Sequence, residues 1–405
     1  MEAVGRPMLH GAMRYKIQRQ RWGGILDNQT WIYPNAVFSD GTLHHDLGLC
    51  VEAGKIAQTC RIDDLPETAS VSRIHGIVAP GFVDVQVNGG GGILVNTATS
   101  ADQIVHMRNI HRNLGTYAIL PTVITDGADV IERCAEMIID TKDEDGLMGL
   151  HIEGPHISVE RRGTHDQNMI RPFDDATKKT IQKLRAQDIF VKLTVAPEAI
   201  TTNQITELAE MGVVISIGHT AANDGQTRQA LTAGATCFTH LFNAMPPIYN
   251  RDPGPVVTAL NSDAYCGLIC DGVHVSYDLI AMAIRSRPVK DRMFLVTDAM
   301  PTVGGPDQFE LYDQIIHVED GRLINAEGSL AGAHVTQLQG VSNLVNHIGI
   351  SAEQAFSMAI TVPADLVKRP EFGSVLHRPL GDLILCADDL YPNCHKIYQD
   401  LFLCQ

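Results

Sequence analysis

Two histidines in this 405-residue chain stand at the ends of short apolar runs. Residues 213–217 are β-branched or small and lead to His219, and residues 236–239 lead to His240. Residues 223–233, between the two runs, have the pattern of a helix. A strand, a helix and a second strand of these lengths form a βαβ unit with parallel strands, so both carboxyl ends lie at the same edge of one sheet. Two imidazoles at that edge predict a metal site.

Glu153 and Asp298 stand at the ends of two further apolar runs. With His219 and His240, Glu153 makes a His2Glu set, which is typical of a catalytic zinc site that keeps one position open for water. Asp298 is then free to act as the general base that takes a proton from the water and returns it to the leaving group. A single histidine at a strand end is more often a hydrogen-bonded packing residue than a ligand. Packing does not explain four such residues at strand ends, so we expect a catalytic metal centre.

The apolar runs and helical stretches predict the frame that positions these side chains. From residue 80 onward, eight expected strands alternate with helices. The strands are expected at residues 83–87, 117–123, 147–152, 190–195, 213–217, 236–239, 266–270 and 293–297. Helices are expected between most of them, for example at residues 101–113, 174–186 and 277–285. This alternation predicts an α/β fold, a (β/α)8 barrel of the TIM type, whose active site lies at the carboxyl ends of the strands.

Both ends of the chain have the pattern of short strands. Residues 30–33, 36–38, 47–52 and 55–59 are strand-like and are separated by turn signals, and residues 383–386 are apolar. We therefore expect residues 1–79 and 365–405 to form one small β-sandwich domain, and residues 80–364 to form the catalytic barrel. Within the barrel segment, residues 304–325 are expected to form a β excursion, followed by helices at 336–347 and 352–360.

The composition excludes several classes of protein. A formal net charge of -16 argues against nucleic-acid binding, and an anionic substrate would need a local cationic pocket. No run of about 18 uncharged apolar residues predicts a membrane span. The basic N-terminal two dozen residues lack the apolar body of a secretory signal. Nine cysteines without a CxxC pair are typical of reduced thiols, so we expect a cytoplasmic protein.

Six motifs resemble those of one known family. They are APGFVDVQVNGGGG, HIEGPHISVERRGTHD, GHTAANDGQTRQALTAGATCFTHLFNAMPP, DGVH, LVTDAM and GSLAGAHVTQLQGV. Together they cover residues 80–364 in the family's order and resemble the N-acetylglucosamine-6-phosphate deacetylases of the amidohydrolase superfamily. The resemblance implies an enzyme that hydrolyses N-acetylglucosamine 6-phosphate to glucosamine 6-phosphate and acetate.

The resemblance also implies roles for the residues at the strand ends. Glu153, His219 and His240 would hold one divalent metal ion per chain, with Zn2+ expected, and Asp298 would be the general acid/base. Gln86 and Asn88 occupy the strand-one positions where many amidohydrolases have a His-x-His pair for a second metal. Neutral amides are poor zinc ligands beside imidazole and carboxylate, so a single-metal site is expected. A role for both amides in hydrogen bonding at the barrel mouth is compatible with such a site.

The same motifs also imply which residues contact the substrate. Arg251 and His274 match the family's phosphate ligands, and arginine suits bidentate recognition of phosphate oxygens. A second subunit can complete the phosphate pocket in this family, which implies a homodimer. The remaining substrate-binding positions are His165, Asn243, Ala244, Leu330, Ala331 and Gly332.

Two departures from the family pattern bear on substrate detail. His156 stands where a large apolar or aromatic residue is usual, so it either alters metal preference or points away, and Met300 stands where a small residue is commoner.

Two alternative functions stay open. The chain could be another amidohydrolase, acting on a related N-acyl amino sugar or a cyclic amide. It could also be a catalytically idle relative that binds sugar phosphate.

Overall fold

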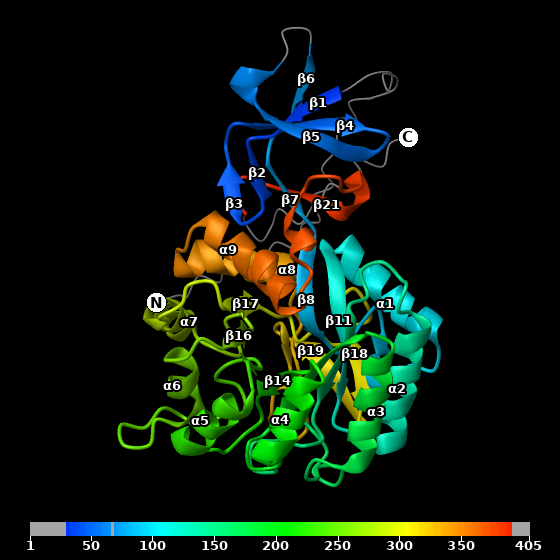
Figure 1. Ribbon diagram of the computed structural model, residues 1–405, viewed down its shortest axis with the longest axis vertical. Helices are drawn as coiled ribbons and strands as arrows, with labels where there is room; N and C mark the ends of the chain where they lie inside the picture. The colour runs from blue at the N-terminus through cyan, green and yellow to red at the C-terminus, as the bar shows by residue number, and fades with distance from the viewer. Residues whose placement is uncertain (1–29, 66–68, 391–405) are drawn as a thin grey trace, which may run out of the picture.

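The computed structural model describes residues 30–65 and 69–390. Figure 1 shows two parts along the long axis: a small group of strands, and a larger ring of strands surrounded by helices. The first 29 residues, for which no secretory signal is expected, and residues 391–405 lie outside the described residues. Among the helices that the structure describes, none combines the length and the apolar character needed to cross a membrane.

Eight parallel strands form the larger sheet, in the spatial order β17-β16-β15-β14-β13-β12-β11-β8. They are β8 (Phe82–Val87), β11 (Thr116–Ile124), β12 (Gly149–Glu153), β13 (Phe190–Val195), β14 (Val214–Ile217), β15 (Cys237–Phe238), β16 (Tyr265–Leu268) and β17 (Met293–Leu295). Each expected strand is present, and most differ from the expected bounds by one or two residues at an end. Sequence neighbours are therefore spatial neighbours, as a (β/α)8 barrel requires.

The two edge strands of this sheet meet at their carboxyl ends. The Asp298 amide donates to the Gln86 carbonyl at 3.1 Å, and the Asn88 amide donates to the Ala299 carbonyl at 2.9 Å. Val87 and Ala299 form a parallel bridge. These bonds join the segment after β17 to the end of β8, so the sheet is nearly closed where the expected site residues lie. The expected (β/α)8 fold class is confirmed.

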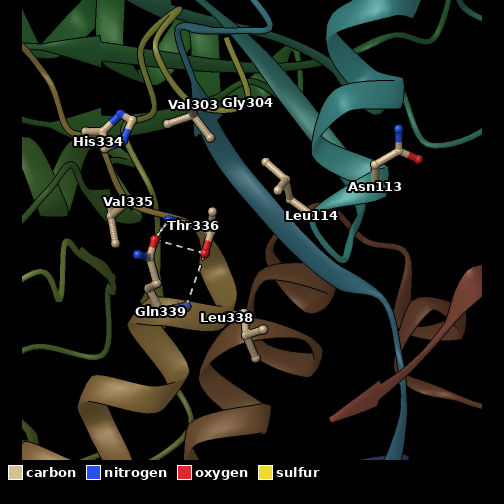
Figure 2. A pocket seen from close by; sticks show the side chains of 9 residues that line it. All are labelled: Asn113, Leu114, Val303, Gly304, His334, Val335, Thr336, Leu338 and Gln339. Carbon is tan, nitrogen blue, oxygen red and sulfur yellow. Dashed lines mark hydrogen bonds between the residues drawn. The ribbon is translucent and has the colours of Figure 1, made fainter. Parts of the chain in front are cut away.

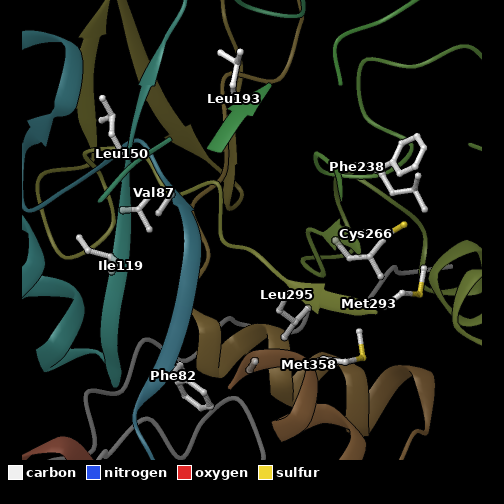
Figure 3. Close-up of a cluster of buried hydrophobic side chains, with 14 of the residues drawn as sticks. Phe82, Val87, Ile119, Leu150, Leu193, Phe238, Cys266, Met293, Leu295 and Met358 are labelled. Atoms are coloured by element: carbon white, nitrogen blue, oxygen red, sulfur yellow. The ribbon is translucent and has the colours of Figure 1, made fainter. Parts of the chain in front are cut away.

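Helices surround the sheet and bury its outer face (Figure 1). They are α1 (Ala101–Asn113), α2 (Ala128–Asp140), α3 (Asp175–Ala186), α4 (Thr202–Glu210), α5 (Asp224–Ala233), α6 (Gly254–Leu260), α7 (Tyr277–Ser286), α8 (Gln337–Asn343), α9 (Ala352–Ala359) and α10 (Thr361–Leu366). The main core contains side chains from most of the strands, including Ile119, Leu150 and Leu193 (Figure 3). Apolar faces of the helices cover these side chains, for example Ile104 of α1 and Ile181 of α3.

Local sequence signals set the helix starts. Asn223 and Gln226 form a capping box, in which each side chain accepts a hydrogen bond from the backbone of the other residue. The expected helix at residues 223–233 therefore begins one residue later, at Asp224. Asp174 caps α3 with a single bond, accepting from the Thr177 amide at 2.8 Å.

Two four-stranded sheets form the smaller part. One has the order β5-β4-β1-β6 and the other β21-β7-β2-β3. Their strands are β1 (Thr30–Tyr33), β2 (Ala36–Ser39), β3 (Thr42–His44), β4 (Leu47–Glu52), β5 (Lys55–Arg61), β6 (Ser70–Arg73), β7 (Ile77–Pro80) and β21 (Leu383–Cys386). Val37 and Leu385 from one sheet share a buried cluster with Leu49 and Ile56 from the other. The antiparallel pairing of β21 with β7 brings the two ends of the described chain together.

The β excursion expected at residues 304–325 is a three-stranded antiparallel sheet, made of β18 (Gln308–Leu311), β19 (Gln314–Glu319) and β20 (Arg322–Leu323). The helix expected at 336–347 divides into α8 and a π-helical turn at Leu344–Ile348. The exact domain boundaries at residues 79/80 and 364/365 stay a proposal of ours.

Candidate functional site

Three of the four expected metal and acid–base residues lie just beyond the carboxyl ends of their strands in an unusual backbone conformation, whereas Glu153 is the last residue of β12. His219, His240 and Asp298 have φ values of 46°, 27° and 53°. Non-glycine residues rarely adopt the left-handed region, and such strain is concentrated at functional sites. The turn at the end of each strand directs these side chains over the barrel mouth.

Glu153, His219 and His240 converge on one point. The Nε2 atoms of the two histidines are 3.0 Å apart. Glu153 Oε1 lies 2.9 Å from His240 Nε2 and 3.4 Å from His219 Nε2. A tetrahedral ion with bonds of about 2.0–2.1 Å separates its ligand atoms by about 3.3 Å, so the spacing of these three donors fits one face of such a site. All three residues are buried, and their donor types fit a divalent metal.

The hydrogen bond of His219 on its other ring nitrogen favours metal binding. His219 Nδ1 lies 3.0 Å from the Arg161 carbonyl oxygen. A carbonyl can only accept, so Nδ1 carries the proton and Nε2 offers its lone pair to the centre of the triad. The corresponding Nδ1 of His240 is buried without a hydrogen-bond partner among the described residues.

The Glu153 carboxylate is held as an anion. Burial raises its pKa, but the imidazoles of His219 and His240 that face it outweigh burial and bring the pKa well below its usual range. The Gln86 side-chain amide donates to both Glu153 oxygens at 3.1 Å. An anionic carboxylate beside two imidazoles is a suitable ligand set for a divalent cation.

Gln86 and Asn88 connect the ligand set to Asp298. Gln86 Nε2 donates to Asp298 Oδ1 at 3.0 Å, and Asn88 Nδ2 donates to the same oxygen at 2.7 Å. The two strand-one amides therefore act as hydrogen-bond donors that orient Asp298. Gln86 Nε2 thus contacts both Glu153 and Asp298, and Asp298 lines the same pocket as the triad, where it can accept a proton from a reacting water.

A pocket of about 260 Å³ lies above the triad. Most of the predicted substrate-binding residues line it, together with the triad and Asp298. The predicted residues in its wall are Asn88, Glu153, His165, His219, His240, Asn243, Ala244, His274, Asp298, Leu330 and Gly332. Three other predicted residues are not in this wall. Gln86 and Ala331 are buried behind it, and Arg251 is exposed on the loop before α6.

His165 and His274 approach the pocket with fixed rings. His165 Nδ1 lies 2.6 Å from Thr125 Oγ1, and its ring centroid is 4.4 Å from that of His219. Burial lowers the pKa of His165 to about 3, so its imidazole is neutral. His274 Nδ1 lies 2.6 Å from the Asp271 carboxylate. This contact favours a proton on Nδ1 of His274.

The two residues that depart from the family pattern lie differently. His156 is buried beside Phe173, and its ring nitrogens contact the Arg171 carbonyl at 3.0 Å and Thr177 Oγ1 at 2.9 Å. Both nitrogens are thus occupied away from the triad, which agrees with the alternative that His156 points away. Met300 lines the pocket itself.

A second pocket of about 240 Å³ lies between the end of α1 and the start of α8 (Figure 2). Its wall contains His334, and the Thr336 hydroxyl donates to Gln339 Oε1 within the helix cap. It shares no residue with the wall of the first pocket. Of the metal-binding residue types it has only His334, so the metal chemistry belongs to the first pocket.

Comparison with known proteins identifies the family. The family model described as "Amidohydrolase family" matches residues 77–402. The chain belongs to the amidohydrolase family. A relative from Shewanella sp. (strain ANA-3), named N-acetylgalactosamine-6-phosphate deacetylase, is 36% identical over 319 residues, which are 78% of this chain and 80% of the relative. A relative from Haemophilus influenzae, named N-acetylglucosamine-6-phosphate deacetylase, is 33% identical over 70% of this chain and 75% of its own.

Solved structures agree with the sequence relatives. The crystal structure of N-acetylglucosamine-6-phosphate deacetylase from Pasteurella multocida superposes with a TM-score of 0.81 at 29% identity, covering 90% of this chain and 97% of that one. The family that the motifs resemble is thereby confirmed, and this amidohydrolase is a metal-dependent amide hydrolase.

Several residues of the site were not predicted from the sequence. Thr125 follows β11 and orients His165, so the strand-end rule that found Glu153 could also have found it. The Arg161 carbonyl that orients His219 is a backbone group and has no signature in the sequence. Ser329 lines the pocket from the GSLAG stretch, next to the predicted Leu330, so the same motif could have indicated it.

Proposed function

We propose that this amidohydrolase removes the acetyl group from an N-acetylhexosamine 6-phosphate. N-acetylglucosamine 6-phosphate is the first candidate, giving glucosamine 6-phosphate and acetate. The observation that carries the proposal is the convergence of Glu153, His219 and His240 in one pocket with Asp298 beside them. We propose that the ion is Zn2+, which suits two imidazoles and one carboxylate.

The residues of the chain perform the proton transfers. The bound metal ion would supply Lewis-acid activation of the water and of the amide carbonyl. The Asp298 carboxylate accepts the proton of the attacking water on the oxygen that Gln86 and Asn88 leave free, and then donates it to the departing amine nitrogen. Gln86 and Asn88 hold this carboxylate through two hydrogen bonds, which fixes its orientation before the substrate binds. His165, as a neutral imidazole, is placed to contact the carbonyl oxygen or the sugar.

Phosphate recognition would require a second subunit. His274 lines the pocket, but no lysine or arginine from the described residues does. Arg251 is exposed on a loop that also exposes Ile248 and Tyr249 by 43% and 57%. An exposed apolar pair beside a cation is typical of an interface. We therefore propose a homodimer in which Arg251 of each chain reaches the pocket of the other.

A second candidate substrate is N-acetylgalactosamine 6-phosphate. It is favoured by the relative from Shewanella, which carries that name at 36% identity. The two sugars differ in the orientation of one hydroxyl, so the acetamide and phosphate contacts proposed above serve both. A cyclic amide is less suited, because it would leave His274 and Arg251 without a phosphate to bind.

We also propose a cytoplasmic location, since the seven cysteines in the described part of the chain are free thiols.

Acetate release from a panel of sugars tests the proposal. The panel contains both N-acetylhexosamine 6-phosphates and unphosphorylated N-acetylglucosamine, and metal per chain is measured on the same sample. We expect acetate from at least one phosphorylated sugar, a much lower kcat/KM without phosphate, and loss of turnover after chelation that Zn2+ restores. Metal-loaded protein that releases no acetate from either phosphate would contradict the deacetylase. Retained binding of the sugar phosphate without turnover would then support the idle relative.

A further inference from the structure

Five buried polar side chains form a continuous hydrogen-bonded chain across the barrel interior, one layer below the triad. Thr122 Oγ1 lies 3.1 Å from His151 Nδ1, and His151 Nε2 lies 2.7 Å from Thr194 Oγ1. Thr194 Oγ1 lies 2.7 Å from Thr239 Oγ1, which lies 2.6 Å from Ser216 Oγ. None of the five side chains is exposed to solvent. We refer to this set as the polar belt.

The polar belt occupies positions that are normally apolar. Interior layers of such barrels are dominated by Val, Ile and Leu, and a buried hydroxyl or imidazole is costly unless its hydrogen bonds are made. Leu150 and Leu193, which precede His151 and Thr194, point to the opposite face and pack in the main core (Figure 3). A fully satisfied polar network of this kind is rigid, because each bond fixes the orientation of the next group.

Three members of the polar belt are close in sequence or register to a metal ligand. His151 stands two residues before Glu153 on the same face of β12, and Thr194 is the register partner of Glu153 on β13. Thr239 directly precedes His240. The polar belt therefore joins the ends of five successive strands, from β11 to β15, at the level where the ligands leave the sheet.

The contact between Thr194 and Thr239 also depends on the residue before His219. A Cβ atom at Gly218 would lie 2.8 Å from Thr239 Cβ and 3.0 Å from Thr194 Cγ2. The missing side chain at Gly218 thus leaves room for the two threonines to meet across β14. The short segment that follows β14 hence accommodates the polar belt at Gly218 and carries a ligand at His219.

We propose that the polar belt is a positioning element for the metal centre, which sets the spacing of Glu153, His219 and His240. Its side chains do not touch the metal or the substrate. They hold the strand ends at the separation that places the three donor atoms about one ligand spacing apart. This inference rests on the metal centre proposed above, and the test is arranged so that the two can fail separately.

Thr194→Val tests the inference because it removes the central hydroxyl and keeps the volume of the side chain. The Zn2+ dissociation constant is measured by competition with a chromophoric chelator, on the full chain. We expect it to rise about tenfold, as for other residues that orient ligands, whereas Thr194→Ser should stay within about threefold of wild type. Rescue by serine separates the hydroxyl from a volume effect.

Thr180→Val on α3 is the matched control. Thr180 is also buried, and its hydroxyl donates to the Ala176 carbonyl at 3.2 Å within its own helix. This variant removes a buried threonine hydroxyl away from the polar belt and should bind Zn2+ like wild type. Equal Zn2+ affinity in Thr194→Val and wild type would overturn the inference and leave the metal centre standing. No Zn2+ binding by wild type would reject both.

Ser216→Ala serves if Thr194→Val does not fold. It removes only the terminal hydroxyl of the polar belt, and the bond from Ser216 to Thr239 is the shortest of the four. We expect a Zn2+ dissociation constant about threefold above wild type, because this variant removes one bond of the polar belt and disturbs the positions of the ligands less than Thr194→Val does. An unchanged constant in this variant would contradict the inference.

Discussion

The Thr297 hydroxyl donates a 2.5 Å hydrogen bond to the Asp84 carboxylate, and this bond joins the last strand of the barrel to the first. Asp84 is completely buried, and its second oxygen accepts from the Gln86 amide at 3.2 Å. Thr297 Oγ1 in turn accepts from the Ala299 amide at 3.2 Å. Thr297 Oγ1 therefore bonds to Asp84 and to the amide of Ala299, the residue after Asp298, and these two bonds stabilise the left-handed backbone of Asp298.

Thr297→Val should therefore lower kcat more than it changes KM. Without the hydroxyl, the turn that carries Asp298 loses its link to Asp84, and small displacements of a catalytic group cost about 10- to 100-fold in rate. We expect a fall of that size in kcat, with KM and metal per chain close to wild type. Steady-state kinetics and metal analysis measure these quantities. Thr297→Ser is the control and should retain most of kcat, and a Thr297→Val enzyme with wild-type kcat would contradict the positioning role.

Asp298→Asn should separate binding from catalysis. The amide oxygen of asparagine can still accept from Gln86 and Asn88, so the side chain is expected to keep its place. It cannot take a proton from water at neutral pH, and general acid–base catalysis contributes about 100- to 10,000-fold. We expect kcat to fall by that factor, with the metal content and the equilibrium affinity for the sugar phosphate retained. Undiminished acetate release would remove Asp298 from its proposed role.

The sequence allowed the chemistry of the site to be predicted because the barrel has a simple geometry. Parallel strands in sequential order end at one edge, so residue type and position after an apolar run were enough to bring Glu153, His219, His240 and Asp298 together. The polar belt and the pair of Asp84 and Thr297 could not be predicted in the same way. Buried threonines are common in strands, and only the register between strands shows which hydroxyls meet.

In the small β part, too, features that depend on pairing between distant strands were not predicted from the sequence. Expected strands covered β1, β2, β4, β5 and β21, but β3, β6 and β7 were missed. β7 pairs with β21, which lies about 300 residues further along the chain, and this pairing buries its side chains. The run at residues 77–80 is apolar, but four residues are too few for the pattern alone to distinguish a strand from another buried segment. Its existence depends on tertiary contacts, which override local propensity.

His111 should make stability depend on pH. It is buried on α1 beside the Gly89 carbonyl, and burial lowers its pKa from 6.5 to about 4. Between these values the unfolded chain binds more protons than the folded one, so the stabilisation is complete above pH 6.5 and is lost as the pH falls towards 4. The stability advantage of wild type over His111→Gln, which keeps an N–H donor, should shrink by about 3 kcal/mol from pH 7.5 to 4. Denaturant unfolding of metal-free samples measures it, and a constant difference would show that His111 is not buried as a neutral group.

Arg251→Ala tests the proposed exchange of phosphate ligands between subunits. The exposed guanidinium does not line the pocket of its own chain, so its loss should chiefly raise KM for the phosphorylated sugar, by about 10- to 100-fold if a charge-assisted bidentate contact is removed. Combining the Arg251→Ala chain with an Asp298→Asn chain in one dimer shows whether Arg251 acts on the pocket of its partner. In a mixed dimer, the pocket of the Arg251→Ala chain keeps its own Asp298 and receives Arg251 from the partner, so one site is complete. Random pairing makes half of the dimers mixed, so we expect co-expression of the two variants to restore activity at low substrate concentration to about a quarter of wild type, whereas each separately purified variant stays at or below about a tenth. Failure of mixed dimers to recover activity would show that Arg251 acts within its own chain or not at all.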